Sequence, residues 1–360
     1  MNKEKNNLLT SNELTFFLLS FVIGGTGIIK LPNVLVETAA QDAWICTIIA
    51  LIYPVIIVLI ASFIINKHPR ENILCLNKKY FGRLFGNILN FIIMIQFLSL
   101  TVGIISDFII LIRTYIVGFL TPLKVGIIAV TLASYGAYKG LKVLGKVSTL
   151  ISYIFILIMI LSIGSLKYGS ILNLQPVFGS GLSNILEATK STAYAYYGWE
   201  ALLLFYPYVQ DTKTIKKSAL KAIGICGVIY LWVVFATTFY IGIDIIPKSY
   251  WSLILVFESI SIPIINNFRY IFTFVWILLS LRISANYYFA TAFNLSNLTK
   301  IDIKKICIFI YPIILYLSIK LSNRILRKEI FDFVTPIFIV FNLISFTLIA
   351  LLISLKHKSS

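Results

Sequence analysis

The chain carries little charge and almost no histidine. Charged residues make up 12% of its 360 residues, whereas a soluble domain has about 25%. Its two histidines, His68 and His357, stand in polar flanks and not in apolar runs. The sequence also lacks a Gly-rich phosphate loop, a nucleophile elbow and paired carboxylates inside an apolar run. We therefore expect neither an enzyme nor a bound metal or cofactor.

Cysteine is scarce as well. The four cysteines show no C-x-x-C spacing, so the sequence predicts neither a disulfide framework nor a zinc site. Three of them lie in apolar runs, where a free cysteine packs as a small apolar side chain. The four are Cys46, Cys75, Cys226 and Cys307.

Hydrophobic residues, by contrast, make up 59% of the chain. Apolar runs of about 20 residues recur from end to end, and each is long enough to cross a hydrocarbon core of about 30 Å. Lipid offers no partner to unpaired backbone groups, so these runs predict an all-α integral membrane protein. Their linkers are too short for a soluble domain, which leaves one membrane domain over residues 1–360. The ten runs cover residues 13–36, 43–65, 84–117, 122–138, 147–166, 185–208, 218–242, 266–294, 303–320 and 334–355.

The net charge of +17 is explained by topology. Most of the 31 basic residues fall in the segments that are inside when the N-terminus is cytoplasmic, so the positive-inside rule predicts that both termini are cytoplasmic. The charge then attracts anionic lipid and not nucleic acid. One outer loop departs from the rule, because it carries Lys320, Arg324, Arg327 and Lys328.

The first apolar run contains three glycines, Gly24, Gly25 and Gly27, followed by Pro32. Each glycine costs about 1 kcal/mol in a helix relative to alanine. A broken membrane helix is tolerated where its backbone is buried in protein or lines a cavity. The freed N–H groups could then hold a carboxylate, and the freed carbonyls an ammonium group or a cation. Close helix packing by small residues is the alternative interpretation.

The sixth run, five runs after the first, is interrupted in the same way. It places Tyr197, Gly198 and Trp199 beside Glu200, a carboxyl group near the middle of an apolar run. Paired discontinuous helices are typical of transporters built from inverted repeats. We therefore predict a five-plus-five inverted repeat, with one repeat over about 13–166 and the other over about 185–355, and a ligand site at the two breaks.

The eighth run holds further polar groups. Glu200 is the most attractive partner for Arg282 by sign, but Arg282 could instead snorkel or cap freed carbonyls. Ser284 and Tyr288 follow on the same helix. We predict that one face of this helix closes the site.

Two more helices supply candidates. Lys30 stands about one turn beyond the glycines, and it either snorkels outward or neutralises Asp107 or Glu200. In the third run, Val102, Gly103 and Ile105 are candidates for the apolar wall of the site. Asp107 and Arg113 are expected to make surface contacts.

Six motifs, in order along nearly the whole chain, carry a resemblance. The chain resembles the B subunits of bacterial spore germinant receptors, a branch of the amino acid–polyamine–organocation superfamily. It departs from the family pattern at Lys30, Lys146 and Tyr270, which replace an apolar residue, an arginine and an acidic residue. The motifs are IGGTGIIKLP (23–32), HPRENILCLNKKYFGRLFGNIL (68–89), YGAYKGLKVLGKVSTL (135–150), LQPVFGSGLSNIL (174–186), YYGWEALLLFYPYV (196–209) and SISIPIINNFRYIFTFVWIL (259–278).

This resemblance implies a leucine-transporter-like fold that binds a small germinant, typically an amino acid, within the spore inner membrane. It also implies partners, namely an A subunit and a lipoprotein C subunit. Carried over by position, backbone groups of Gly24, Gly25, Thr26 and Gly27 would contact the ligand, opposite Gly198, Trp199 and Glu200, with residues around Ser284–Tyr288 closing the site. A ligand-sensing subunit is the leading function. The alternative is an amino acid symporter coupled to a proton or cation.

Overall fold

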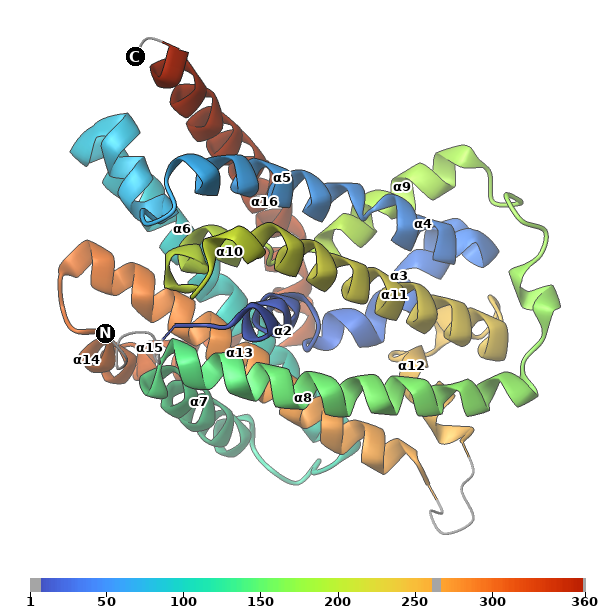
Figure 1. Ribbon diagram of the computed structural model, residues 1–360. Coiled ribbons are helices and arrows are strands. Elements are labelled where there is room, and N and C mark those ends of the chain that lie inside the picture. Colours follow the sequence, from blue (N-terminus) through green and yellow to red (C-terminus); the bar gives the residue numbers. More distant parts are fainter. Residues whose placement is uncertain (1–7, 261–266, 359–360) are drawn as a thin grey trace.

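The computed structural model describes residues 8–260 and 267–358, without the side chains of Thr26, His357 and Lys358, and the described chain is almost wholly helical (Figure 1). The all-helical prediction is confirmed. Its α-helices are α2 (Ser11–Val22), α3 (Thr26–Ala39), α4 (Ala43–Ile49), α5 (Ile52–Lys67), α6 (Ile73–Tyr115), α7 (Pro122–Lys139), α8 (Leu141–Leu161), α9 (Leu182–Ala195), α10 (Ala201–Phe205), α11 (Ile215–Ile241), α12 (Ser252–Glu258), α13 (Arg269–Thr299), α14 (Ile303–Phe309), α15 (Tyr311–Lys320) and α16 (Arg324–Lys358).

Several helices meet the length and hydropathy expected of a membrane span. Ala40, with a φ of 45°, separates α3 from α4 within the first of these stretches, as the predicted runs 13–36 and 43–65 require. The number of spans and the division into two repeats stay predictions. Among the described residues the six qualifying stretches are Gly27–Lys67, Ile73–Tyr115, Leu141–Tyr168, Thr212–Ile241, Arg269–Thr299 and Arg324–Lys356.

The start of α16 differs from the sequence-based prediction. The tenth run was expected over 334–355, with Arg324, Arg327 and Lys328 in an outer loop, but α16 already begins at Arg324. A helix can extend past the bilayer with polar side chains, because its backbone hydrogen bonds are made within the segment itself. The charges of the predicted loop therefore lie on a helix.

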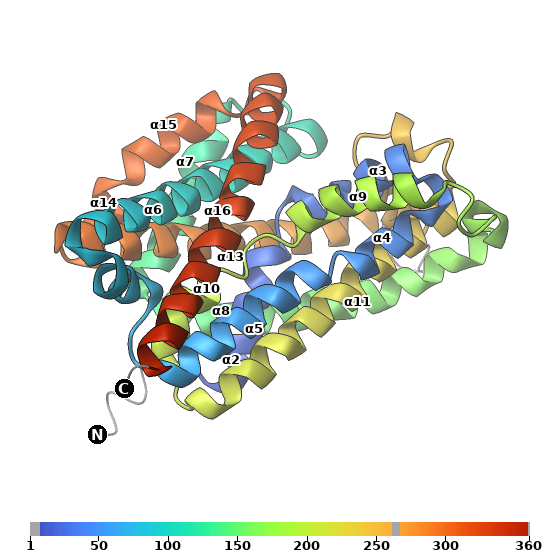
Figure 2. The ribbon, with the colours of Figure 1, turned by 90° about the horizontal axis from the view of Figure 1, so that it is seen from above.

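The centre of the molecule is occupied by helices from both halves of the chain. In Figure 1, α2 and α10 lie between α11 above and α13 and α8 below, and α2 packs on both α8 and α11. α13 packs on α6, α7 and α8, and α16 crosses α5 and α6 (Figure 2). The start of α2 and the end of α16 lie at the same end of the bundle in both views. Which side of a membrane that end faces stays a prediction.

At the opposite end, the long connection between α8 and α9 is fastened to the end of α3 by one carboxylate. Asp42 is fully buried, and its two oxygens accept hydrogen bonds from the backbone N–H of Phe178 (2.7 Å), the N–H of Ser180 (2.9 Å) and the hydroxyl of Ser180 (2.7 Å). A carboxylate that satisfies two backbone donors holds a loop more firmly than a neutral acceptor can.

We expect Asp42→Ala to lower the free energy of unfolding by about 2–3 kcal/mol, because it leaves buried donors without acceptors. Thermal unfolding of the purified protein in detergent measures the change. Asp244→Ala, in the exposed loop after α11, is the matched control and should unfold like the wild type. Equal melting temperatures of the two variants would contradict this role of Asp42.

Candidate functional site

The predicted break in the first apolar run is present. α2 ends at Val22 and α3 begins at Thr26, so residues 23–25 leave the helical path. Gly24 has a φ of +152°, and a Cβ added to it would lie 2.9 Å from the carbonyl oxygen of Leu279. Glycine is required there for both reasons.

The second predicted break is present too, between α9 and α10, over residues 196–200. Gly198 has a φ of +131°, and a Cβ there would lie 2.8 Å from the carbonyl oxygen of Phe21 and 2.7 Å from the hydroxyl of Tyr287. The second break therefore lies against the backbone of the last turn of α2, directly before the first break. This contact brings the two halves of the chain together at one point.

Five successive carbonyl groups, from Phe21 to Gly25, accept hydrogen bonds from side-chain donors. These donors come from α11 and α13, so the break is held open by hydrogen bonds and not by backbone strain alone. The pairs are Tyr287 Oη to Phe21 O (2.8 Å), Tyr230 Oη to Val22 O (3.2 Å), Arg282 Nη2 to Ile23 O, Ser280 Oγ to Gly24 O (2.9 Å) and Trp276 Nε1 to Gly25 O (3.4 Å).

The sequence left two interpretations of Arg282 open, and the described structure shows no ion pair between Arg282 and Glu200. Glu200 is 3% exposed, and its carboxylate accepts hydrogen bonds from the hydroxyl of Tyr53 (2.5 Å) and from the backbone N–H of Gly198 (2.8 Å). Arg282 instead caps a freed carbonyl, that of Ile23, as the alternative interpretation held. Glu200 is hydrogen-bonded near the second break and Arg282 near the first, although their opposite charges suggested a pair.

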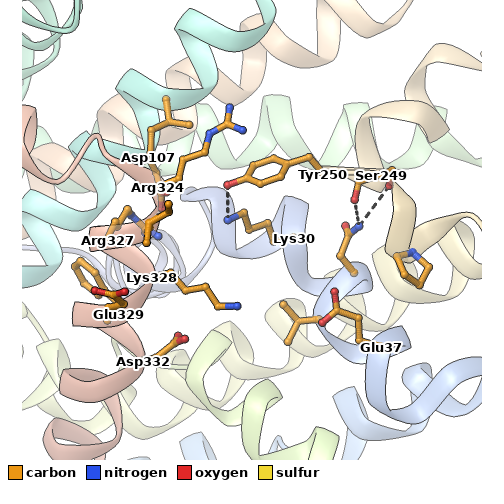
Figure 3. A pocket seen from close by; sticks show the side chains of 16 residues that line it. Lys30, Glu37, Asp107, Ser249, Tyr250, Arg324, Arg327, Lys328, Glu329 and Asp332 are labelled. Carbon is orange, nitrogen blue, oxygen red and sulfur yellow. Dashed lines mark hydrogen bonds and ion pairs between the residues drawn. The ribbon is translucent and has the colours of Figure 1, made fainter.

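Lys30 pairs with neither of its predicted carboxylates. Its amine donates to the hydroxyl of Tyr250 (3.1 Å) and lies 4.6 Å from the centre of that ring, as Figure 3 shows. Asp107 forms an ion pair with Arg327 of α16, and Arg113 donates to the carbonyl of Leu120 (2.8 Å). Lys30 therefore reaches outward, as the snorkelling interpretation predicted.

A cavity of about 580 Å³ lies where the breaks meet. Phe21, Gly25 and Gly27 line it from the first break, and Tyr197 from the second. Its far walls come from α6, α13 and α16 and are mostly apolar. Those wall residues include Leu100, Gly103, Ile104, Ile283, Tyr287, Phe331 and Thr335.

The cavity adjoins an outer vestibule of about 790 Å³, which is charged (Figure 3). The two spaces share several lining residues and are therefore adjacent. Both acidic and basic side chains line the vestibule, which suits a ligand that carries both charges. The shared residues are Lys30, Val34, Glu37, Asp107, Arg327, Lys328, Phe331 and Asp332.

A family model described as a spore germination protein matches residues 9–327. The chain belongs to the spore germination protein family. Its fold resembles the crystal structure of MhsT in complex with L-phenylalanine, with a TM-score of 0.66 and 17% sequence identity, covering 95% of this chain and 88% of that one. The predicted leucine-transporter-like fold is thereby confirmed, and so is an integral membrane protein.

Curated relatives carry the same family name. The spore germination protein GerQB of Bacillus cereus is 22% identical over 263 residues, which cover 73% of each chain. The spore germination protein YndE of Bacillus subtilis (strain 168) is 22% identical over 328 residues, 88% of each chain. The spore germination protein B2 of the same organism is 26% identical over 225 residues, 60% of this chain and 59% of the relative.

In this spore germination protein, the predicted site residues that line the cavity are the ligand-binding candidates Gly25, Gly27 and Tyr197, the charge candidate Lys30 and the wall candidate Gly103. Two more, Gly24 and Gly198, shape the breaks without lining the cavity. The side chain of Thr26 lies outside the described part of the structure.

The remaining predicted site residues lie behind the walls of the cavity. Val102 is buried, and its carbonyl accepts from Ser318 (3.5 Å). Ser284 bonds within its own helix, to the carbonyl of Ser280 (2.7 Å), and Tyr288 donates to the carbonyl of Cys307 (2.6 Å). Trp199 and Glu200 are buried beside the second break and are likewise not among the residues that line the cavity.

Several lining residues were not singled out as ligand contacts by the sequence-based prediction, among them Leu100 and Phe331. Tyr287 lies one position from the predicted Tyr288, on the face of α13 that meets Phe21. Leu100 and Phe331 gave no signal, because an apolar wall residue looks like any other residue of an apolar run. Phe331 also fell in the stretch expected to be a loop.

Proposed function

We propose that this spore germination protein is a germinant-sensing membrane subunit that binds an amino-acid-like ligand in the cavity between its two helix breaks. The observation that carries the proposal is the contact of Gly198 with Phe21, which joins both breaks around one cavity. Ligand sites of this fold class lie where discontinuous helices from the two halves meet.

The walls suggest how such a ligand would lie. The start of α3, next to Gly25, presents free N–H groups and the positive end of a helix dipole, which favour a carboxylate. Across the cavity, Tyr197 lines the wall from the second break. The apolar wall of Leu100, Ile104 and Phe331 would take a side chain.

Binding would act by favouring one state of the helix bundle. A ligand shifts such an equilibrium by its differential affinity, typically about 1–3 kcal/mol. We propose that the shift passes to A and C subunits of a germinant receptor in the spore inner membrane, with both termini of this chain on the core side. On this account the protein has no catalytic activity.

The same fold also serves symporters, so one experiment must separate the two functions. We expect spores lacking the gene to lose the response to one germinant in a panel of amino acids and sugars. We also expect the purified protein in liposomes not to accumulate that germinant, labelled, under an imposed proton or sodium gradient. Co-purification with A and C subunits would support the receptor. Gradient-driven accumulation would instead establish a symporter.

A further inference from the structure

Next to the end of α2, Arg282 carries a buried positive charge that has no counterion in the described structure. Arg282 on α13 is 3% exposed, within an apolar helix long enough to cross a membrane. None of the ion pairs in the described structure involves it. A charge placed in the middle of a membrane is costly, so something must offset that cost.

Oxygen atoms from two other helices accept from both terminal nitrogens of the guanidinium, while its Nε is buried without a partner in the described structure. Arg282 donates to the hydroxyl of Ser152 (2.7 Å) and the carbonyl of Ser148 (3.4 Å), both on α8, and to the carbonyl of Ile23 at the end of α2. The carbonyl end of a helix carries partial negative charge, so it stabilises a cation placed against it. Neutral oxygens at the end of a half-helix are also the groups with which transporters of this fold class hold a sodium ion.

The neighbouring carbonyls are already used. Those of Phe21, Val22 and Gly24 accept from tyrosine and serine hydroxyls of α11 and α13. The carbonyl of Ile23 is the one in this group that accepts from a charged donor. The place that a metal cation could take is therefore filled by the protein itself.

We propose that Arg282 is a resident cation, which holds the end of α2 against α8 and α13 in the way that a bound metal ion would. This inference rests on the contacts of Arg282 and not on the proposed ligand. It has two consequences. The break needs no sodium or other metal cation to keep its shape, and removal of the guanidinium group creates a vacant cation site.

Chemical rescue tests the second consequence. Arg282→Ala should lower the melting temperature of the purified protein in detergent by about 5–10 °C, since a change of 1 kcal/mol shifts it by about 2–4 °C in a large domain. Ethylguanidinium chloride at millimolar concentration should restore at least half of the loss, and choline chloride at equal ionic strength should restore none. The wild type should gain nothing from either salt.

Arg113→Ala is the matched control, because Arg113 also donates to a carbonyl, that of Leu120, at the partly exposed end of α6. It should not be rescued. Stabilisation of Arg282→Ala alone, by ethylguanidinium or by sodium, supports a vacated cation site. The same response in all three proteins, or rescue in none, overturns the proposal.

The first consequence is tested on the unaltered protein, so the proposal stays falsifiable if Arg282→Ala does not fold. The wild-type melting temperature should be the same in sodium, potassium and choline chloride at equal ionic strength. A stabilisation specific to sodium or potassium that saturates in the millimolar range would show a bound metal cation and overturn the proposal.

Discussion

Gly25→Leu is expected to abolish the response to the germinant while leaving the protein folded. Gly25 has an ordinary φ of −90°, and the atoms nearest to a Cβ built on it, Gly27 N and Ile104 Cγ1, are 3.9 Å away. A larger side chain is therefore tolerated by the backbone and projects into the cavity that Gly25 lines. It would occupy the space beside the N-terminus of α3 that the ligand carboxylate requires.

Dose–response curves of spores carrying the variant measure this effect. We expect the germinant concentration for half-maximal response to rise by at least about 100-fold, the equivalent of losing roughly 2.7 kcal/mol of binding free energy. The melting temperature should stay within a few degrees of the wild type. A normal dose–response in this variant would show that the germinant does not bind in this cavity.

Gly24→Leu provides the contrast, because the neighbouring position should behave in the opposite way. Its φ of +152° and the carbonyl of Leu279 at 2.9 Å from an added Cβ strain any larger residue. We expect misfolding and poor membrane insertion for Gly24→Leu. Together the two variants separate a blocked site from a damaged fold.

Glu200→Ala has the second largest expected effect, and it concerns stability. The carboxylate accepts from the hydroxyl of Tyr53 and the N–H of Gly198, both buried, and its removal leaves both donors without an acceptor. Each such donor costs about 1–3 kcal/mol, so we expect a loss of about 3–4 kcal/mol.

Glu200→Gln should cost less, about 1–2 kcal/mol, because one amide oxygen can still accept from Gly198 while the amide N–H₂ donates to the oxygen of Tyr53. In thermal unfolding in detergent, the melting temperature should be highest for the wild type, lower for Glu200→Gln and lowest for Glu200→Ala. Glu187→Ala, exposed on α9 in the same broken helix, is the control and should be neutral. If Glu200→Ala were as stable as this control, Glu200 would not hold the second break.

Both helix breaks could be predicted from the sequence, because their signals are local. Glycines in an apolar run weaken a helix wherever that run lies, and a carboxyl group beside Gly198 must be satisfied by something other than lipid. These two facts place the breaks without any knowledge of packing. The family motifs then supply the fold that brings the two breaks together.

The contacts of the charged groups could not be predicted in the same way. Arg282 and Glu200 have opposite signs, but each is hydrogen-bonded to backbone and hydroxyl groups whose positions depend on how α2, α5, α8 and α13 pack. Tyr287 lines the cavity and Tyr288 does not, and a step of one residue turns a helix by about 100°. Which of two adjacent tyrosines faces the cavity therefore depends on the rotation of α13 against α2.

The most direct test of the central claim is protection of a cysteine placed in the cavity. Gly27 lines the cavity, and nothing lies within 4 Å of a Cβ built on it, so Gly27→Cys should fold and react with a hydrophilic thiol reagent. Cys75 is exposed and is replaced by serine first, while Cys46, Cys226 and Cys307 are buried.

The germinant identified by the panel should slow labelling of this cysteine at least about tenfold at saturation, as expected when ligand and reagent compete for one space. A compound of the panel without germinant activity should have no effect, and neither should the germinant on a cysteine at Asp244. An unchanged labelling rate at a concentration that still triggers germination would place the ligand elsewhere and contradict the account.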